Sequence, residues 1–298
     1  MPALVFQGWW VRALKRGAVA LAMAISFLPI FWLVSTSFKP YEEWTVYPPV
    51  WISNHPTLQN YRIVFSPEAA RTFAAKQAGS LDYKVAGSAW KAFGDSAIIS
   101  TLATLFSLTL GTLAAYSIAR YGTGGKAYPF QLLTLRMFPP IAVVVPMVAL
   151  FSVLHLSDTY FGLVLAYTAF TLPFSIWMVR SFIEDIPADL EGAAMVHGLT
   201  AFQAFRRITL PLIRGGLLAT ALFVFILNWS EFLFALTLTS GNVTTVTVQV
   251  AKYVSASSGT LYGVQAAMGA ISTLPVIAFG YLIQRHLVRG LTFGSIKR

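Results

Sequence analysis

Residues 187–211, PADLEGAAMVHGLTAFQAFRRITLP, form a polar stretch between two long apolar runs of the chain. Pro187 is suited to begin a helix, because a proline at the first helical position has no hydrogen bond to lose. Gly198 is suited to end that helix, since glycine readily adopts the left-handed conformation found there. Thr200 and Gln203 have the spacing of a capping box, which predicts the start of a second helix. The stretch therefore predicts two short helices in succession.

The sequence also predicts where the second helix ends. Arg206 and Arg207 carry the positive charge that is favoured at the negative end of a helix dipole. Pro211 would stop the helix, because proline has no amide hydrogen to donate. A connection that only joins two membrane helices is usually short and irregular. A structured pair of helices therefore indicates a surface that contacts a partner.

The chain as a whole has the composition of a membrane protein. It is 56% hydrophobic and 11% charged, with a mean hydropathy of +0.67, whereas soluble domains contain about 25% charged residues. A helix needs about 20 mostly apolar residues to cross the hydrocarbon core. The runs are too long and too weakly alternating for barrel strands, so they are predicted to be helices. Six runs reach this length: 17–38, 95–119, 128–154, 159–180, 212–239 and 262–287.

The net charge of +10 follows the predicted topology and does not indicate a nucleic-acid-binding face. With six spans, both termini and the loops after the second and fourth spans lie on one side, which holds most of the basic residues. The short loops of the other side contain Lys252 alone, while long loops such as 39–94 cross largely regardless of their charge. Because basic residues in short loops stay in the cytoplasm, both termini and residues 187–211 are expected to be cytoplasmic.

The first apolar run is interpreted as a membrane anchor and not as a cleaved signal peptide. The triplet Ala22-Met23-Ala24 lies inside the run, and apolar sequence continues to Phe38. The apolar region of a signal peptide spans only about 7–15 residues. The chain has no cysteine, which excludes disulfides, thiolate metal sites and thiol catalysis.

Residues 187–211 resemble the cytoplasmic loop of the permease subunits of bacterial ATP-driven importers. In that family, Glu-Ala-Ala is followed after three residues by glycine, and nine residues later by Ile-x-Leu-Pro. Gly192 stands at the position of the family's glutamate, Glu191 lies one residue before it, and His197 stands where an aspartate is common. With residues 228–232, the similarity is closest to the second permease of maltose-type carbohydrate importers. The matching residues are Ala193, Ala194, Gly198, Ile208, Leu210 and Pro211.

This resemblance implies an all-α membrane protein with the type I ABC importer permease fold. It implies one domain over residues 1–298, six membrane helices, an external loop 39–94 and a cytoplasmic coupling loop 181–211. The implied partners are a second, related permease, two ATPase subunits that bind ATP and Mg, and an external sugar-binding protein. No cofactor is expected on this chain, which is not expected to be an enzyme by itself.

The resemblance also implies which residues couple the chain to the ATPase. Glu191 is expected to make a polar docking contact, the alternative being a solvated loop acid. Small side chains at Ala193 and Ala194 would allow close approach, and Gly198 would provide the bend between the helices. The expected coupling residues are Glu191, Gly192, Ala193, Ala194, Gly198, Phe202, Phe205, Ile208, Leu210 and Pro211.

Two further segments are predicted to lie outside the membrane on the opposite side. The extension at 66–90 is expected to contain a helix at about 68–77, either as a packed cap over the membrane helices or as a contact surface for a binding protein. Alternating residues at 243–248 predict a hairpin or an extended segment. By resemblance, the external loop 240–261, which contains these residues, is expected to contact the binding protein; a plain connector is the alternative. The expected contact residues are Ser255, Ser257, Ser258 and Gly259.

Polar residues inside the apolar runs are candidates for the transport pathway, because ionisable groups in spans usually face the protein interior or water. Glu231 lies within the fifth run, three residues after Asn228, so the two are expected to share a helix face. Trp229 adds an aromatic face that suits a sugar ring. Arg136, in the third run, is expected either to extend toward the cytoplasmic surface or to pair with Glu231. The alternative for Glu231 is a hydrogen bond that ties helices together.

The chain contains no recognisable nucleotide, metal or catalytic motif. The Gly-rich residues 122–127 lack the first glycine and the final Ser/Thr of a phosphate loop, and the four histidines are scattered. An ion-driven secondary transporter is the alternative function, because in-span prolines and Glu231 fit it as well. Such transporters usually show paired repeats, and the sequence has no convincing one. The sugar, polyol or glycerol derivative carried stays open.

Overall fold

The computed structural model describes residues 9–76, 89–125, 127–255 and 259–293. The chain divides into two compact units. The first comprises residues 1–88 and 252–271, and the second comprises residues 89–251 and 272–298. Four helices within the described ranges are long and apolar enough to cross a membrane alone, and two bent helix pairs bring the number to as many as six.

The first unit joins the end of the long apolar helix α1 to the short helix α2. Asn60 of α2 lies against the chain that follows α1, and its side-chain amide donates to the carbonyls of Ser37 and Lys39 at 2.9 and 2.8 Å. Gly263 packs so closely that a Cβ there would come within 2.6 Å of the Asn60 amide nitrogen. The elements are α1 (Trp9–Ser37), η1 (Tyr41–Glu43), α2 (Gln59–Phe65), α3 (Pro67–Lys76), β1 (Val254–Ser255), β2 (Gly259–Thr260) and the start of α14 (Tyr262–Phe293).

The prediction of a helix within the 66–90 extension is confirmed by α3. The prediction of an extended or hairpin segment at 243–248 is wrong, because α13 begins at Val246. The side chains of Asp95 and Ser96 accept hydrogen bonds from the Thr244 and Val246 amides at 2.8 Å each. These tertiary contacts provide acceptors for amides before and at the start of α13 that have no partner within the helix. The alternation of residues in the local sequence does not predict such contacts.

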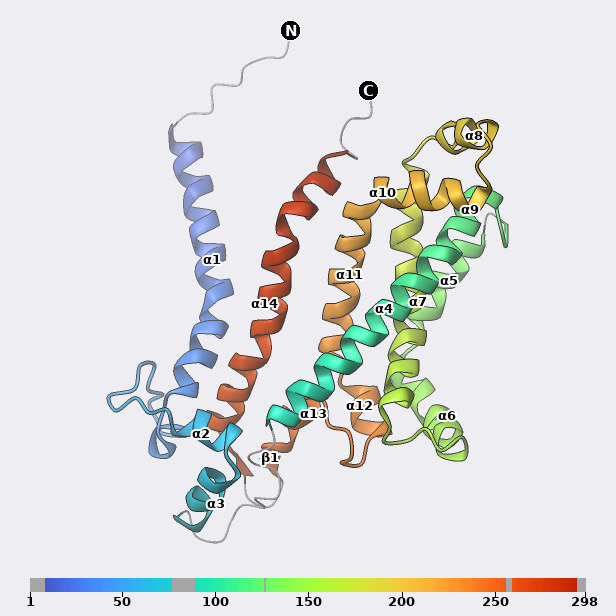
Figure 1. Ribbon diagram of the computed structural model, residues 1–298. Coiled ribbons are helices and arrows are strands. Elements are labelled where there is room, and N and C mark those ends of the chain that lie inside the picture. The colour runs from blue at the N-terminus through green and yellow to red at the C-terminus, as the bar shows by residue number, and fades with distance from the viewer. Residues whose placement is uncertain (1–8, 77–88, 126, 256–258, 294–298) are drawn as a thin grey trace. The chain divides into compact units, whose positions relative to one another are not determined.

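The second unit is a bundle in which α4, α7 and α11 pack against one another. The elements are α4 (Ala89–Tyr121), α5 (Tyr128–Met137), α6 (Pro140–Val153), α7 (Tyr160–Glu184), α8 (Asp189–Val196), α9 (Ala201–Ala204), the π-helical turn η3 (Phe205–Thr209), α10 (Leu210–Leu212), α11 (Arg214–Trp229), α12 (Leu233–Leu238), α13 (Val246–Lys252) and the rest of α14. Figure 1 shows α8, α9 and α10 together at one end of this bundle, and α12 and α13 at the other. These are called the α8 end and the α12 end below.

Two apolar clusters fill the second unit. Around the α12 end, buried side chains of α4, α6, α7 and α12 pack together, including Ile99, Phe151, Tyr167 and Phe234. Toward the α8 end, a second cluster joins α4, α7 and the start of α11, including Ile118, Val179, Ile183 and Ile213. The two clusters share α4 and α7, so the polar groups described below are attached to packed ends of these helices.

The apolar run 128–154 is not one continuous helix, and two of its in-span prolines mark where it is interrupted. The chain forms α5 and α6 with a bend of 86° between them. Phe138 and Pro139 have extended ψ angles of 128° and 122°. The double proline Pro139-Pro140 explains the break, because neither residue donates an amide hydrogen and a residue before proline is driven from the helical conformation.

The predicted single helix over 212–239 is wrong. Helix α11 ends at Trp229, and α12 starts at Leu233, so Glu231 lies in the break between them. Asn228 and Glu231 therefore do not share a helix face. The carboxylate of Glu231 accepts hydrogen bonds from the amides of Phe234 and Ala235 at 2.9 and 3.2 Å, and so caps the start of α12.

Candidate functional site

The segment from Pro187 to Leu212, called the α8–α10 segment below, has the local structure that its sequence predicts. Helix α8 follows Pro187, and Gly198 has the left-handed φ of +92° that terminates it. The capping box is present in full. The Thr200 hydroxyl accepts from the Gln203 amide at 3.3 Å, and the Gln203 side chain accepts from the Thr200 amide at 2.9 Å. The predictions for Gly198 and for the capping box are confirmed, whereas Pro187 is not the first helical residue, because α8 begins at Asp189 with Ala188 as its N-cap.

The end of the second helix differs from the prediction. Pro211 does not stop it, because the chain continues through the π-helical turn η3 into α10 and ends at Leu212. The Leu210 amide donates to the Phe205 carbonyl, five residues earlier, as a π-helical turn requires. A proline removes one amide donor, and a widened turn accommodates that loss without ending the helix. A bend of 74° then separates this stretch from α11.

Glu191 points into the protein and is 5% exposed. Three side chains donate hydrogen bonds to its carboxylate. Arg120 Nε and Thr209 Oγ1 reach Oε1 at 2.8 and 2.6 Å, and the Tyr116 hydroxyl reaches Oε2 at 2.6 Å. Arg120 also forms an ion pair with it. The four residues Tyr116, Arg120, Glu191 and Thr209 are called the Glu191 cluster below.

The donors of this cluster keep Glu191 ionised. Burial alone would raise the pKa of the Glu191 carboxyl, but the hydrogen bonds from Thr209, Tyr116 and Arg120 and the positive charge of Arg120 outweigh it and lower the pKa. A buried charge is tolerated when it is paired and hydrogen-bonded. The expectation that Glu191 meets a docking partner therefore changes, because its carboxylate is occupied by donors from its own chain.

The Glu191 cluster joins three segments that are far apart in sequence. Tyr116 and Arg120 lie one turn apart at the end of α4, Glu191 lies in α8, and Thr209 lies in η3. The Tyr116 ring also packs on Phe205 of η3, with ring centroids 4.5 Å apart. The α8–α10 segment is thus attached to the end of α4 by both polar and aromatic contacts.

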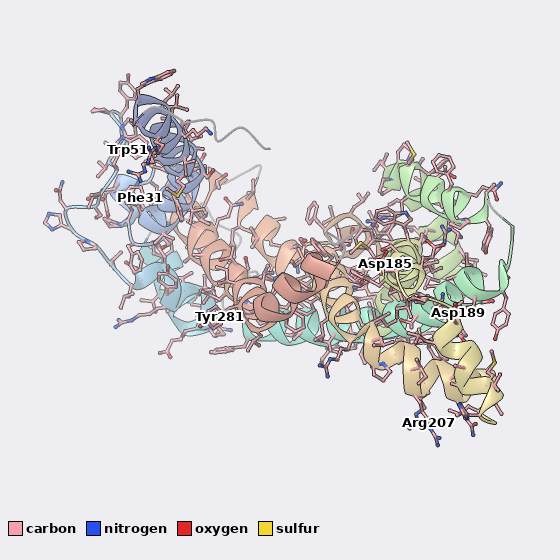
Figure 2. All side chains as sticks on the ribbon, turned by 90° about the horizontal axis from the view of Figure 1, so that it is seen from above. Phe31, Trp51, Asp185, Asp189, Arg207 and Tyr281 are labelled. Atoms are coloured by element: carbon pink, nitrogen blue, oxygen red, sulfur yellow. The ribbon has the colours of Figure 1, made fainter. Side chains whose placement is uncertain are left out.

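The outer face of the α8–α10 segment is apolar and basic. Leu190, Met195, Val196 and Phe202 are exposed, with Val196 the most at 87%. A hollow of about 390 Å³ is lined by Phe202, Gln203, Arg206 and Arg207. Figure 2 shows Arg207 at the outer edge of the ribbon, on the same side of the bundle as Asp189 of α8. Exposed large apolar side chains gathered on one structured element mark a contact surface.

The structure divides the expected coupling residues between this outer face and the interior. Glu191 and Phe205 are buried. Ala193, Gly198, Phe202 and Pro211 are exposed, whereas Gly192, Ala194, Ile208 and Leu210 are half-buried.

The expected pathway residues are largely engaged in contacts between helices. The Asn228 amide donates to the Thr104 hydroxyl of α4 at 3.1 Å, and the Trp229 indole donates to the Ser272 carbonyl of α14 at 2.9 Å. Both side chains are buried. For Glu231, a hydrogen bond that ties helices together was the alternative to lining the pathway. Asn228 and Trp229 form hydrogen bonds of that kind.

Arg136 forms no ion pair with Glu231 among the described residues. Its guanidinium lies over the rings of Phe170 and Phe174 of α7, 5.1 and 5.2 Å from their centroids. Arginine is attracted to aromatic faces by their quadrupole. Pairing with Glu231, one of the two alternatives for Arg136, is therefore replaced by contacts with α7.

Two aspartates that the sequence did not single out organise the α12 end. Asp95 of α4 accepts from Lys91, from the Tyr160 hydroxyl and from the Thr244 amide, at 2.6, 2.6 and 2.8 Å. Asp158, in the turn before α7, has a φ of +56°. It accepts from the Ser240 hydroxyl and from the Asn242 and Val243 amides at 2.8, 2.9 and 2.9 Å. The loop from 240 to 246 is therefore held by two carboxylates.

Of the expected binding-protein contacts, Ser255 and Gly259 pair with each other in the two-stranded sheet β1–β2. Ser257 and Ser258 lie outside the described residues. A hairpin is thus present in this loop, but it lies after α13 and not over the alternating residues 243–248.

Residues 107–293, which include the α8–α10 segment and the whole Glu191 cluster, match the family model for the binding-protein-dependent transport system inner membrane component. The chain belongs to this family. It is therefore a transport permease subunit and a multi-pass protein of the inner membrane, as the resemblance implied. Membership in a binding-protein-dependent family does not fit the alternative of an ion-driven secondary transporter.

Individual relatives cover the permease almost end to end. It is 34% identical over 280 residues to the trehalose transport system permease protein SugB of Mycobacterium tuberculosis, covering 93% of this chain and 94% of that one. It is 32% identical over 283 residues to the trehalose/maltose transport system permease protein MalG of Thermococcus litoralis, covering 94% and 95%.

A solved structure confirms the permease fold. A chain of a bacterial ABC transporter involved in the import of the acidic polysaccharide alginate matches with a TM-score of 0.68. The match covers 92% of the permease and 94% of that chain, at 20% identity. The prediction of the ABC importer permease fold is thereby confirmed.

Sequence reasoning did not single out Tyr116, Arg120 and Thr209, the three residues that donate hydrogen bonds to Glu191. One signal was present, because Arg120 follows directly on the second predicted span, at 95–119. Nothing in the linear sequence indicates that Arg120 meets a carboxylate 71 residues later. That pairing arises only when α4 and α8 meet at the same end of the bundle.

Proposed function

We propose that this chain is one of two membrane subunits of an ATP-driven sugar importer and that the α8–α10 segment docks on a cytoplasmic ATPase. The observation that carries the proposal is the outer face of this segment. Leu190, Met195, Val196 and Phe202 present apolar side chains to the outside, while Glu191 fixes α8 from the inside. A rigid helix with an exposed apolar face suits insertion into a groove of another protein.

The sugar class rests on the relatives, which are transport permeases for trehalose and maltose. The ATP and Mg would be bound by the ATPase, with two copies of that subunit beneath a pair of related permeases. An external binding protein would deliver the sugar to the α12 end. Closure of the ATPases would move the α8–α10 segment and shift the bundle between two discrete packings, as alternating access requires.

The proposed orientation rests on charge. Arg206, Arg207 and Arg214 lie in or directly after the α8–α10 segment, whereas the short loops predicted for the other side contain only Lys252. Short loops rich in lysine and arginine remain in the cytoplasm. Both termini and the α8 end are therefore cytoplasmic in this proposal.

The test is affinity purification of this chain from its native membrane, followed by identification of the co-purified subunits and an ATPase assay. The proposal expects an ATPase, a second permease and a binding protein whose ligand is a sugar. Purification of the chain without any ATPase, together with uptake that needs no ATP, would contradict it.

A glycine substitution tests the role of the segment. Gly198→Val places a β-branched residue at φ +92°, where L residues are strained although no neighbour lies within 4 Å. We expect uptake to be lost while membrane insertion is retained. Gly125→Val is the matched control, because Gly125 has a φ of +79° and open space as well but lies in the turn after α4. Equal uptake by both variants would remove the coupling role of the bend at Gly198.

A further inference from the structure

Two kinds of connection attach α8 to the rest of the bundle. The first is the chain itself, which enters α8 through Pro187 and leaves it at Gly198. A helix held only by its two ends could pivot about them when a partner pushes on its outer face. The second kind of connection is the Glu191 cluster, which holds the middle of α8 and opposes such a pivot.

Arg120 is the central member of this second connection. Its Nε donates to Glu191 Oε1 at 2.8 Å, and its Nη2 donates to the Ile186 carbonyl at 3.1 Å. One guanidinium of α4 therefore holds both α8 and the link between α7 and α8. The planar group of arginine presents several donors in a fixed geometry, which makes this double contact rigid.

Thr209 and Tyr116 extend the connection to the start of α11. Thr209 has no exposed surface, and its hydroxyl donates to the same Glu191 oxygen as Arg120 does, at 2.6 Å. Tyr116 donates to the other oxygen and packs its ring on Phe205. Because Phe205 and Thr209 are the two ends of η3, a shift of α8 acts on the turn that leads through α10 into α11.

The geometry points to Tyr116, Arg120 and Thr209 as positioning residues that make α8, the end of α4 and η3 move as one body. A force applied to the outer face of α8 is then delivered directly to α4 and α11, and not only through the chain links at Pro187 and Gly198. This inference rests on the proposed function, because it names the path by which docking at α8 reaches the membrane helices.

The charged character of the Glu191 cluster is consistent with a positioning role. Replacing a buried ion pair by apolar residues of similar volume is often neutral for stability, so the pair is weak as a device for stability alone. A carboxylate with donors from three segments has, in contrast, one arrangement in which all its bonds are made. The cluster therefore fixes the position of α8 relative to α4.

The absence of cysteine allows a direct test with spin labels, since no native thiol competes for the label. The chain carries Asp189→Cys in the first turn of α8 and Leu113→Cys on α4, both at exposed positions outside the cluster and outside the apolar docking face. The complex with its partner subunits is purified, and the distance between the labels is measured without nucleotide and with ATP plus orthovanadate. ATP hydrolysis and uptake are measured on the same preparations.

In the protein with the native Glu191 cluster, we expect a single distance between the two spin labels, and we expect nucleotide to leave it unchanged. In Arg120→Ala and in Glu191→Ala, nucleotide is expected to produce a second distance, and uptake is expected to be lost while ATP hydrolysis remains. The double variant is expected to be no worse than either single variant, because both remove the same link. A merely structural role would lower the amount of assembled complex without changing the distance or the ratio of uptake to hydrolysis.

Glu184→Ala is the matched control. Glu184 pairs with Arg180 at 2.7 Å on α7, but its side chain is 45% exposed, against 6% for Glu191. It is expected to leave distance and uptake unchanged. Where an alanine variant does not assemble, the near-isosteric Glu191→Gln and Thr209→Val provide the same readout.

Two results overturn the inference. A label distance that shifts with nucleotide in the unmodified cluster would show that α8 moves independently of α4. Cluster variants with an unchanged distance and unchanged uptake would show that the link is dispensable. Both results require a complex that contains the ATPase, whereas absence of any ATPase would overturn the proposed function itself.

Discussion

Gly111 of α4 lies directly against Ser175 of α7. A Cβ at position 111 would come within 2.7 Å of the Ser175 Cβ, and one turn away the hydroxyls of Ser107 and Ser175 are hydrogen-bonded at 2.7 Å. Small residues allow membrane helices to approach closely, and hydroxyl pairs hold them there. The α4–α7 pair is therefore a close contact on which the α8 end is built.

Gly111→Leu is expected to separate α4 from α7 and to destabilise the chain by about 1–3 kcal/mol, the usual cost of overpacking. The measurement is the thermal unfolding midpoint of the purified complex. Gly94→Leu is the control, because Gly94 lies on the same helix and a Cβ there would meet no atom within 4 Å. Equal midpoints for the two variants would contradict the close approach at Gly111.

At Gly198 the expected defect arises from backbone conformation, so it depends on the residue introduced. A left-handed φ costs a residue with a Cβ about 1–2 kcal/mol, and asparagine bears this cost better than most. Gly198→Asn is therefore expected to retain more uptake than Gly198→Val. The ratio of uptake to assembled complex measures this, and the reverse order would show that the glycine is needed for space and not for its φ of +92°.

Asp158 gives the α12 end a dependence on pH. Burial would raise the pKa of the Asp158 carboxyl, but hydrogen bonds from Val243, Asn242 and Ser240 outweigh it and lower the pKa to about 2. A carboxyl with a lowered folded-state pKa contributes stability that is present above its ordinary value and lost as the pH falls through the lowered one.

The contribution of Asp158 is therefore expected to be complete above pH 3.8 and to disappear as the pH falls toward about 2. Asp158→Asn is expected to remove this part of the acid dependence. Unfolding midpoints of the two proteins, recorded from about pH 5 downward, should converge as the carboxyl becomes protonated. A constant difference across this window would contradict a role for the charge.

Glu231 is expected to act as a helix cap. Glu231→Ala leaves the Phe234 and Ala235 amides at the start of α12 without their acceptor and should destabilise the chain by about 1 kcal/mol. Glu231→Gln retains one carbonyl acceptor and should recover much of this stability. Uptake that is lost in Glu231→Gln at unchanged stability would instead restore the transport-pathway interpretation of this carboxylate.

The sequence by itself determined the local features that depend on residues close to one another. The six apolar runs, the left-handed Gly198, the capping box at Thr200 and Gln203, and the helix in the 66–90 extension follow from composition and short spacing. The permease family could also be recognised from the sequence, because the spacing of its loop motif lies within one short stretch. Helix length was predicted less well over 212–239, where the break at 230–232 divides a run that looks continuous by hydropathy alone.

Only the tertiary structure decided what the polar side chains do. Glu191 had the sequence context of a docking residue, yet donors from α4 and η3 enclose it. Glu231 had the context of a pathway residue, yet it caps α12. The alternation at 243–248 gave way to a helix held by Asp95 and Ser96. The physical reason is the same in each case. A buried polar group must find partners, and those partners come from segments that meet only when the bundle is assembled.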